Sequence, residues 1–334
     1  MKINKKLHSV ALVSVALILF LILVSSASSA SPKITETQIT TSGSASNPDI
    51  SGNKIVWQDS RLGNEKSDIY MYDIFTKKET QITNNGSNHY SPVIYRNKVA
   101  WMEWYVNPVD LVDGGFYMQD ISTKKQRLIM TFSDLVDNSA IYGDKIVFEI
   151  YNVASPGVYI YSLSTSKLET ISESAFYPAI YGNKIVSVGY QDGIPGDGSD
   201  NIYIYDLSAK KQIQITTSGL ASNPAIYKNK VVWQDSRNGN LDIYMYDIST
   251  RKETQLTTNS SDSENPVVYG NSIVWQDNRN GNWDIYAYDL ITHQQIHTTN
   301  KSDQVEPSID NNKVVWQDNR NGKSDIYMGA LKYK

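Results

Sequence analysis

The sequence has no cysteine and very little histidine. The absence of cysteine from all 334 residues excludes disulfides, thiolate metal sites and catalytic thiols. Only His89, His293 and His297 follow the first thirty residues. The chain therefore offers few general bases that titrate near pH 7 and few nitrogen ligands for zinc or iron.

The chain also lacks any run of basic residues. It contains 31 Lys and Arg against 35 Asp and Glu, a net charge of −4. Without residues 1–30, which hold Lys2, Lys5 and Lys6, 28 basic and 35 acidic residues remain, a net charge of −7. This mildly acidic balance argues against nucleic acid as a partner.

Only one long hydrophobic segment is present, at the N-terminus. Three lysines precede an apolar run from Val10 to Val24, and small residues follow at 25–31. This order predicts a secretory signal peptide over residues 1–30, cut after Ala30. The alternative is an uncleaved anchor, although Leu7–Val24 is slightly shorter than the span of about 20 residues that a bilayer needs. In both cases residues 31–334 are expected to be secreted, extracellular or on the cell surface, and membrane contact would occur only through the uncleaved segment.

The rest of the chain repeats one unit seven times. An early proline recurs at Pro48, Pro92, Pro178, Pro224, Pro266 and Pro307, and Ser139 takes its place once. A central position recurs as Trp57, Trp101, Phe148, Ser187, Trp233, Trp275 and Trp316. Because no spacer separates the units, residues 31–334 are predicted to form one domain.

Each unit reads as four short strands. In the fifth unit these are Ala225–Tyr227, Lys230–Gln234, Ile243–Asp247 and Glu253–Thr257, separated by Lys228-Asn229, Asn238-Gly239 and Ser249-Thr250. The middle two strands are apolar on both faces, which is typical of a sheet covered on both sides. Four-stranded sheets repeated about every 42 residues predict an all-β fold, a seven-bladed β-propeller.

The two ends of the chain predict how the ring closes. The last unit stops after its third strand, at Ile326–Leu331, while an unpartnered fourth strand, Glu36–Thr40, begins the mature chain. Residues 38–48 are closely repeated at 214–224. The first strand is therefore expected to complete the last blade and to cover an open sheet edge.

Four stretches carry a family resemblance. They are Trp57–Tyr70, Trp233–Tyr244, Trp275–Tyr286 and Trp316–Tyr327, with the pattern Trp-Gln-Asp-x-Arg-Asn-Gly-Asn-x-Asp-Ile-Tyr. This pattern resembles the TolB-like propeller repeat, especially in the form seen in archaeal cell-surface proteins. The resemblance implies a propeller used for extracellular or periplasmic binding and scaffolding, with some relatives acting as carbohydrate-active enzymes.

The charged residues of this pattern are expected to be structural. Asp would cap the hairpin backbone and Arg would pair with acids. The residues concerned are Asp59, Arg61, Asp68, Asp235, Arg237, Asp242, Asp277, Arg279, Asp284, Asp318, Arg320 and Asp325. A calcium loop is the alternative, but Arg237 stands where a third oxygen ligand is needed and no bidentate Glu follows. We therefore expect no metal and no cofactor, with calcium as the one open alternative.

No catalytic residue stands out. His89 is placed in a turn before the second unit, and His293 and His297 lie around the outer strand of the sixth unit. Residues spaced i, i+4 do not share a face on a strand, so these two histidines are poor candidates for a metal pair. Paired carboxylates for glycoside chemistry stay open because acids are plentiful.

Units 2, 3 and 4 lose the repeated pattern together. Their loops between the second and third strands are expected to share one face with exposed aromatic and acidic residues. Such residues suit sugar or peptide binding, and drift in tolerant loops is the alternative explanation. The candidate ligand-binding residues are Trp104, Tyr105, Asp110, Asp113, Tyr151, Tyr190, Asp192 and Asp197.

Three Asn-x-Ser sequons predict glycosylation. They begin at Asn85, Asn259 and Asn300, and each follows a fourth strand, on the same face as the candidate loops. The common occurrence of Asn and Ser in loops is the alternative explanation.

Three functions remain compatible with these features. The leading hypothesis is a non-catalytic binding or scaffold module for an extracellular glycan or protein. A carbohydrate-active enzyme, a lyase or hydrolase, is the runner-up, and an acid cluster with raised pKa values around the central channel would favour it. A structural subunit of the cell envelope is the third hypothesis, which predicts self-association.

Overall fold

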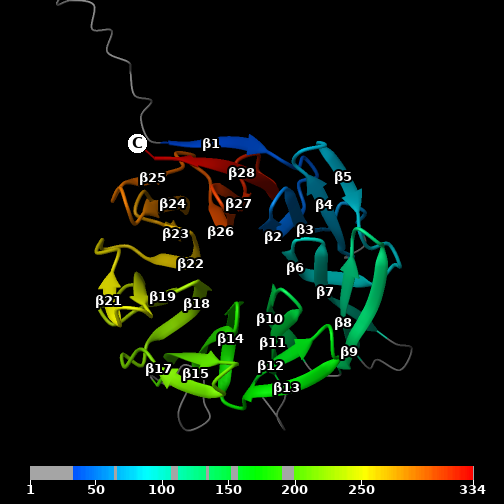
Figure 1. Ribbon diagram of the computed structural model, residues 1–334. Helices are drawn as coiled ribbons and strands as arrows, with labels where there is room; N and C mark the ends of the chain where they lie inside the picture. The colour runs from blue at the N-terminus through cyan, green and yellow to red at the C-terminus, as the bar shows by residue number, and fades with distance from the viewer. Residues whose placement is uncertain are drawn as a thin grey trace, which may run out of the picture.

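Seven four-stranded antiparallel sheets surround a central channel (Figure 1). The computed structural model describes residues 33–63, 66–106, 112–132, 135–151, 157–189 and 199–333. All regular secondary structure in these ranges is β-strand, and the ring is the all-β, seven-bladed propeller that the repeats predict. Within these residues there is no helix with the length and hydropathy of a membrane span.

The blades follow one another along the chain. Blade 1 comprises β2 (Ala45–Ser51), β3 (Lys54–Asp59), β4 (Asp68–Asp73) and β5 (Lys78–Gln81). Blade 2 comprises β6 (Asn88–Tyr95), β7 (Lys98–Val106), β8 (Val112–Asp120) and β9 (Lys125–Phe132). Blade 3 comprises β10 (Leu135–Tyr142), β11 (Lys145–Tyr151), β12 (Gly157–Ser162) and β13 (Lys167–Ser172). Blade 4 comprises β14 (Ala175–Tyr181), β15 (Lys184–Gly189), β16 (Asn201–Asp206) and β17 (Lys211–Gln214).

The remaining three blades follow the same order. Blade 5 comprises β18 (Ala221–Tyr227), β19 (Lys230–Asp235), β20 (Asp242–Asp247) and β21 (Lys252–Gln255). Blade 6 comprises β22 (Ser263–Tyr269), β23 (Ser272–Asp277), β24 (Asp284–Asp289) and β25 (Gln295–His297). Blade 7 comprises β26 (Gln304–Asp310), β27 (Lys313–Asp318), β28 (Asp325–Lys332) and the N-terminal strand β1 (Lys33–Gln38).

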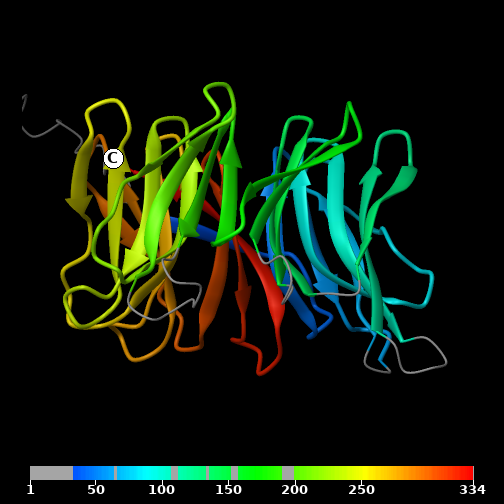
Figure 2. The same cartoon turned by 90° about the horizontal axis from the view of Figure 1, so that it is seen from below.

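The up-and-down order of the strands gives the disc two different faces. Short turns join the first strand of a blade to the second and the third to the fourth, and we name their side the turn face. The connections from the second strand to the third, and from each blade to the next, lie on the opposite side, the loop face. Figure 1 looks onto the turn face, and Figure 2 shows the disc from its edge.

The core lies between neighbouring blades. The central residue of the second strand is fully buried in most blades, as Trp57, Trp101, Phe148, Trp233, Trp275 and Trp316. Val56 and Ile69 of blade 1 pack with Val99 and Trp101 of blade 2, and the other blades repeat this arrangement. Both faces of each inner strand are therefore covered by apolar side chains, which explains why these strands do not alternate in sequence.

Each first strand contains a β-bulge that the sequence reading missed. The pairing of β18 with β19 shifts between Ser222 and Ala225, so the strand begins at Ala221 and not at Ala225 as predicted. The residue before the repeated proline has a left-handed backbone, with φ values of 45–56° at Asn47, Ser91, Asn138, Tyr177, Asn223, Asn265 and Glu306. Asn tolerates this conformation better than most residues, which explains its recurrence.

The glutamine of the repeated Trp-Gln-Asp holds this bulge across the blade interface. Gln58 Oε1 accepts a hydrogen bond from the Ser91 N–H of the next blade at 3.1 Å, and Gln234 Oε1 accepts one from the Asn265 N–H at 2.8 Å. These bonds satisfy backbone groups that the bulge removes from the strand ladder.

The N-terminal strand completes blade 7, as predicted. β1 pairs antiparallel with β28 from Lys33 opposite Lys332 to Gln38 opposite Tyr327, so it begins three residues before and ends two residues before the expected Glu36–Thr40. Ile34 is buried in the cluster that contains Trp316 and Leu331. Gly329 stands where blade 1 has Tyr72, and a β-carbon there would overlap the Ile34 and Trp316 side chains. The incoming strand thus fills space that a tyrosine occupies in other blades.

Candidate functional site

The first aspartate of the repeated pattern is buried at the centre of a polar cluster. Asp235 accepts hydrogen bonds from the Arg237 side chain at 2.6 Å, the Arg237 N–H at 2.9 Å and the Trp233 indole at 3.4 Å. The guanidinium lies 4.3 Å above the Tyr244 ring and also contacts Glu253 at 2.7 Å. Asp59, Asp277 and Asp318 make the same bonds to Arg61, Arg279 and Arg320.

The second aspartate of the pattern joins the third strand to the fourth. Asp242 accepts hydrogen bonds from Thr257 Oγ1 at 2.8 Å and Gln255 Nε2 at 2.9 Å. Asp68 and Asp325 bond the equivalent Thr and Gln residues, whereas Asp284 accepts from Asn280 and Asn282. All of these partners belong to the protein.

These contacts bear on the calcium alternative. The Arg237 guanidinium lies against Asp235, where a cation would have to sit. Among the described residues, no group of three or more His, Asp or Glu side chains is arranged to hold a metal ion.

His89 lies inside a strand and not in the predicted turn. It belongs to β6 and is fully buried, with Nδ1 3.1 Å from Asp68 Oδ1 and Nε2 3.5 Å from Glu103 Oε2. Glu103 occupies the position that Asp235 has in blade 5, and His89, opposite it in β6, occupies the position of Ala221. Because solvent does not reach His89, this cluster is not accessible to a substrate.

The candidate arc on units 2–4 falls largely outside the described residues. Asp110, Tyr190, Asp192 and Asp197 are not described. The backbones of Tyr105, Asp113 and Tyr151 lie in β7, β8 and β11, but their side chains are also outside the described part. Trp104 of β7 is half-buried and packs against the cluster that contains Met102 and Phe116. Its position at the loop-face end of blade 2 agrees with the predicted face.

The three sequons lie on the loop face. Asn85 is exposed between β5 and β6, while Asn259 and Asn300 are half-buried before β22 and β26. Each asparagine side chain accepts a hydrogen bond from the N–H two residues later, at 2.9–3.1 Å. Asn85 is therefore the most accessible of the three to a glycosylating enzyme.

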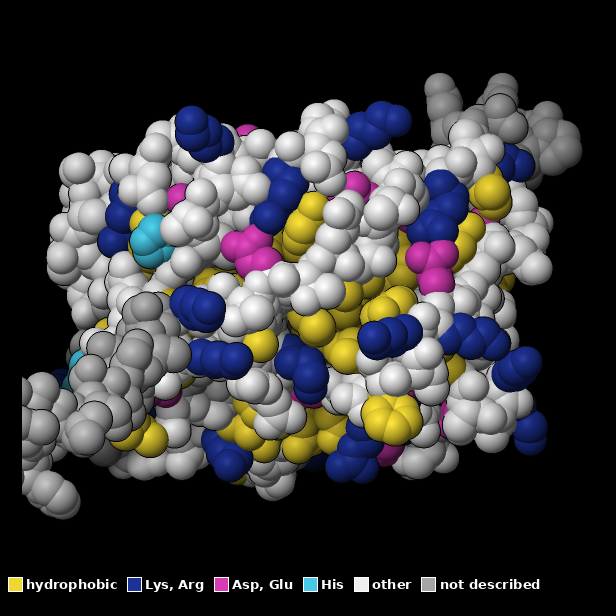
Figure 3. Space-filling model, turned by 90° about the horizontal axis from the view of Figure 1, so that it is seen from above, with side chains coloured by type: hydrophobic (Ala, Val, Ile, Leu, Met, Phe, Trp, Pro, Cys, Tyr) yellow, Lys and Arg dark blue, Asp and Glu magenta, His cyan; other side chains and the backbone are white. Residues whose placement is uncertain are grey.

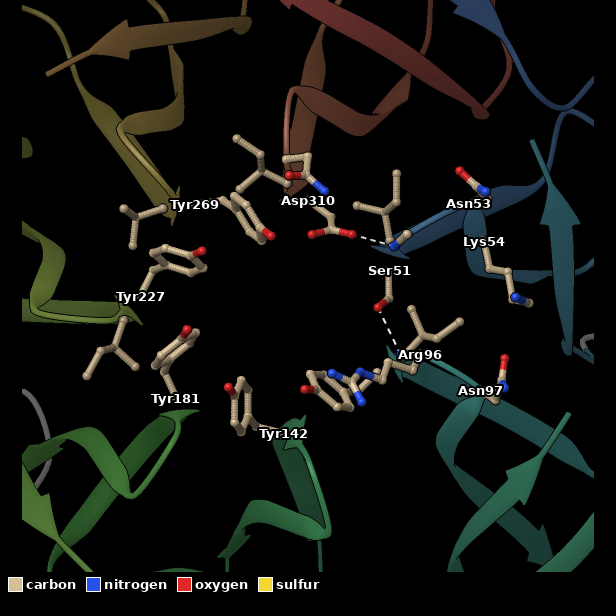
Figure 4. A pocket seen from close by; sticks show the side chains of 18 residues that line it. Ser51, Asn53, Lys54, Arg96, Asn97, Tyr142, Tyr181, Tyr227, Tyr269 and Asp310 are labelled. Carbon is tan, nitrogen blue, oxygen red and sulfur yellow. Dashed lines mark hydrogen bonds between the residues drawn. The ribbon is translucent and has the colours of Figure 1, made fainter. Parts of the chain in front are cut away.

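A ring of tyrosines surrounds the turn-face mouth of the channel. Tyr95, Tyr142, Tyr181, Tyr227 and Tyr269 end the first strands of blades 2–6, and Ser51 and Asp310 hold the equivalent positions in blades 1 and 7. Neighbouring ring centroids are 4.9, 4.7, 4.8 and 4.4 Å apart. These residues line a cavity of about 620 Å³, which we name the tyrosine socket (Figure 4).

Three phenols of the socket have raised pKa values. Burial raises the pKa values of Tyr95, Tyr142 and Tyr269, and interactions with neighbouring phenols raise them further. The negative charge of Asp310 adds to the shift at Tyr269. These three hydroxyls are therefore neutral groups that can both donate and accept hydrogen bonds at physiological pH.

Two charged side chains flank Ser51 at the edge of the socket. Asp310 accepts a hydrogen bond from the Gly52 N–H, and Ser51 Oγ accepts one from the Arg96 N–H at 2.9 Å. The Arg96 guanidinium lies 5.3 Å from the centroid of the Tyr95 ring. Figure 4 shows Asp310 and Arg96 on either side of Ser51, with the tyrosines opposite.

The loop-face mouth of the channel has a different lining. The left-handed bulge residues surround a cavity of about 490 Å³, with Tyr177, Glu306 and several Asn side chains. Burial raises the pKa of Glu306, and it raises the pKa of the nearby Asp49 to about 6. The Asp49 carboxylate already accepts hydrogen bonds from the Ile94 N–H, the Ile50 N–H and the Ser308 hydroxyl.

Sequence reasoning did not identify the socket. Its signal is a tyrosine that recurs immediately before the turn between the first and second strands in five of seven units. Read within one unit, that tyrosine looks like an ordinary strand residue. Only the ring geometry brings five copies to one axis.

Comparisons with known proteins support the fold. No protein-family model matches the chain, and no curated protein sequence matches it. Its structure is similar to the propeller domain of the Trilobed protease from Pyrococcus furiosus, which has an open velcro topology. The TM-score is 0.70 and the identity 12%, covering 87% of this chain and 94% of that one.

Two further structures give the same result. TolB from Acinetobacter baumannii has a TM-score of 0.50 at 15% identity, covering 85% of this chain and 78% of that one. This chain has a TolB-like seven-bladed β-propeller fold. Oligogalacturonate lyase from Vibrio parahaemolyticus has a TM-score of 0.60 at 12% identity, covering 90% and 94% of the two chains. At these identities the likeness concerns the fold alone.

Proposed function

We propose that this TolB-like propeller is a secreted or cell-surface binding module that holds an extracellular glycan in the tyrosine socket without chemical turnover. The tyrosine socket is the observation that supports this proposal. It presents five aromatic rings from five blades around one cavity, with neutral hydroxyls among them. Sugars bind such surfaces through their C–H faces and hydroxyl groups.

The polar groups in the socket favour binding over catalysis. Asp310 is the carboxylate of the socket, and it already bonds the Gly52 N–H. Glycoside hydrolysis commonly requires two carboxylates that flank the reacting bond. At the N-terminus, basic residues are followed by an apolar run and then by small residues. This order supports an extracellular location, and the resemblance of the repeat to cell-surface proteins agrees with it.

One observation favours the alternative, a carbohydrate-active enzyme. Asp49 and Glu306, on neighbouring blades near the loop-face mouth, both have raised pKa values. A protonated carboxyl is a candidate general acid. The three hydrogen bonds that Asp49 accepts limit its access to a substrate, so we rank this function second.

The proposal is tested with a glycan array probed by the full chain, followed by affinity measurements on each glycan retained. Tyr181→Phe and Tyr142→Phe should weaken binding about three- to tenfold, because each removes a hydrogen-bonding hydroxyl and keeps the ring. Tyr205→Phe, a change in β16 away from the socket, is the matched control and should bind as the parent does.

The same array separates the competing sites and functions. Trp104→Ala, Tyr105→Ala and Tyr190→Ala test the candidate arc on the loop face. Loss of binding in these variants, with the socket variants unaffected, would move the site to the arc. Release of new reducing ends from a bound glycan would establish the enzyme, and an array without any binding would reject glycan recognition.

A further inference from the structure

Basic side chains gather on the turn face although the whole chain is acidic. The turns between the third and fourth strands carry adjacent pairs of exposed basic residues in four blades: Lys77-Lys78, Lys124-Lys125, Lys210-Lys211 and Arg251-Lys252. Figure 3 shows one side of the disc from its edge, where Lys and Arg lie on both halves but Asp and Glu are fewer in the half toward the turn face. The net charge of −4 therefore conceals a polarised disc.

A second set of lysines lies closer to the channel. The second strand begins with Lys in every blade except blade 6: Lys54, Lys98, Lys145, Lys184, Lys230 and Lys313. Some of this charge is paired, since Lys184 lies 3.3 Å from Asp206 and Lys145 lies 2.8 Å from Asp144. Lys98 and Lys313 instead donate to backbone carbonyls of Gly143 and Gly52.

Aspartates on this face accept hydrogen bonds from backbone N–H groups of the turns. The Asp247 carboxylate accepts hydrogen bonds from the Ser249 and Thr250 N–H groups, at 2.9 and 3.0 Å. Those bonds hold the pKa of Asp247 below its usual range, and Asp73 and Asp206 behave in the same way. The acids are therefore needed to form the turns, whereas the exposed lysines are not.

Basic residues also occupy turn positions where glycine would be less strained. Lys77, Lys124, Lys210 and Arg251 have φ values of 50–58°, and so do Arg96 and Lys228 in the turns after the first strands of blades 2 and 5. Blades 1, 3, 4 and 6 place glycine at the position of Arg96. A left-handed backbone disfavours side chains other than Gly, Asn and Asp, so the backbone conformation does not account for the basic residues at these sites.

Arg96 brings this charge into the socket. Its guanidinium lies beside the Tyr95 ring. Its positive charge opposes the effect of burial on the pKa values of Tyr95 and Tyr142. Within the described residues, Arg96 forms no ion pair with an acid. A planar guanidinium next to phenol hydroxyls fits a carboxylate, which can accept two N–H bonds from it.

We infer that the turn face binds an acidic glycan, with the carboxylate of one sugar paired to Arg96 in the tyrosine socket and the neighbouring sugars crossing the lysine-bearing turns. This inference rests on the proposed glycan-binding function and specifies its ligand. A sugar can enter the concave socket, whereas the flat surface of a bilayer cannot. Exposed Phe75 and Ile291 on the same face make anionic lipid the competitor to be tested.

The test compares two ligands that differ only in charge. One probe is a uronic acid hexasaccharide, and the other is the same hexasaccharide with its carboxylates reduced to alcohols. Binding to the full chain is measured by calorimetry at low and high salt. The acidic hexasaccharide should bind at least about tenfold more tightly, and salt should weaken it selectively.

Arg96→Gly is the informative variant because glycine suits the left-handed turn. It should fold at least as well as the parent, lose about tenfold in affinity for the acidic hexasaccharide, and bind the reduced one unchanged. Ser166→Gly is the matched control, since it makes the same backbone change at a left-handed, exposed and uncharged turn residue. It should bind both probes as the parent does.

Each other outcome overturns the inference in a different way. Equal binding of both hexasaccharides would keep the glycan-binding function and reject the acidic ligand. Binding of the acidic probe that Arg96→Gly does not weaken would reject the assigned site. Binding to vesicles of anionic phospholipid, with no hexasaccharide bound, would make the face a membrane surface and reject the acidic glycan, while the glycan array would still decide the proposed function.

Discussion

At the residue scale, the repeated Trp-Gln-Asp-x-Arg pattern has a separate contact for each polar side chain. Asp235 joins Trp233 and Arg237 within its own blade, and Gln234 reaches the bulge of the next blade. Burial alone would raise the pKa of Asp235, but hydrogen bonds from Arg237 and Ser218 outweigh burial and lower it. The carboxylate is therefore held ionised inside the protein.

Asp235→Asn should destabilise the protein by about 2–3 kcal/mol at pH 7, because it removes the buried negative charge that accepts hydrogen bonds from Arg237 and leaves Arg237 paired only with Glu253. A lowered pKa means that ionised Asp235 stabilises the fold above about pH 4, and that this contribution disappears as the pH falls through the folded-state pKa. The difference between variant and parent should therefore shrink as the pH falls below about 4 in urea denaturation.

Glu253→Gln is the control for this prediction. Glu253 pairs with the same Arg237, but its side chain is 34% exposed, so its loss should cost less than about 1 kcal/mol. Equal effects of the two substitutions, or a difference that does not depend on pH, would contradict the assigned role of Asp235.

At the scale of one element, β1 closes the ring by supplying the strand that blade 7 lacks. It adds a full set of backbone pairs to β28, and it also supplies Glu36, which bonds Arg320 at 2.6 Å as Glu253 bonds Arg237. Ile34 and Gly329 are complementary, since the small residue in β28 leaves room for the large one in β1. Closure therefore depends on side-chain fit as well as on strand pairing.

Ile34→Ala should lower the free energy of unfolding by about 2–4 kcal/mol through the cavity that it leaves beside Trp316. Gly329→Ala should cost about 1–3 kcal/mol through overpacking. The double variant should be more stable than the sum of the two losses predicts, because the smaller residue 34 relieves the overlap.

Denaturant unfolding of the three variants checks this coupling. Thr35→Ala, an exposed neighbour in the same strand, should change stability by no more than about 0.5 kcal/mol. Strict additivity of the Ile34 and Gly329 effects would show that the two side chains do not share the space between β1 and β28.

At the scale of the whole molecule, the topology sorts charges that are mixed along the chain. Every turn between a third and a fourth strand lies on one face, and most of the aspartates of the repeated pattern lie toward the other. Net charge is therefore a poor guide to how this protein meets a charged surface, because association depends on the local potential of each face.

The protein should bind to a cation exchanger at pH 7 and low salt despite its net charge of −4. Replacing Lys77, Lys78 and Lys125 with Glu should abolish retention. Replacing Lys66, Lys301 and Lys323, which are exposed on the loop face, makes the same change in net charge and should leave retention largely intact. Equal loss in both triple variants would mean that total charge alone decides adsorption.

The sequence by itself determined the fold class, the number of blades and the closing strand. These follow from local patterns: a period near 42 residues, inner strands that are apolar on both faces, an unpartnered strand at the start and a missing fourth strand in the last unit. It also predicted the face on which Trp104 lies, at the end of blade 2 where β7 pairs with the start of β6. It misplaced the start of the first strands and the surroundings of His89, because a bulge and a buried polar cluster depend on neighbouring blades.

Only the tertiary structure decided which recurring residues meet. Tyr142 and Tyr181 are 39 residues apart in sequence, yet their rings are 4.7 Å apart at the channel mouth. Arg96 lines the same socket for the same reason, since its turn is one of seven around the axis. A periodic sequence specifies each blade through local contacts, whereas a site at the axis arises only when the closing strand brings all the blades into one ring.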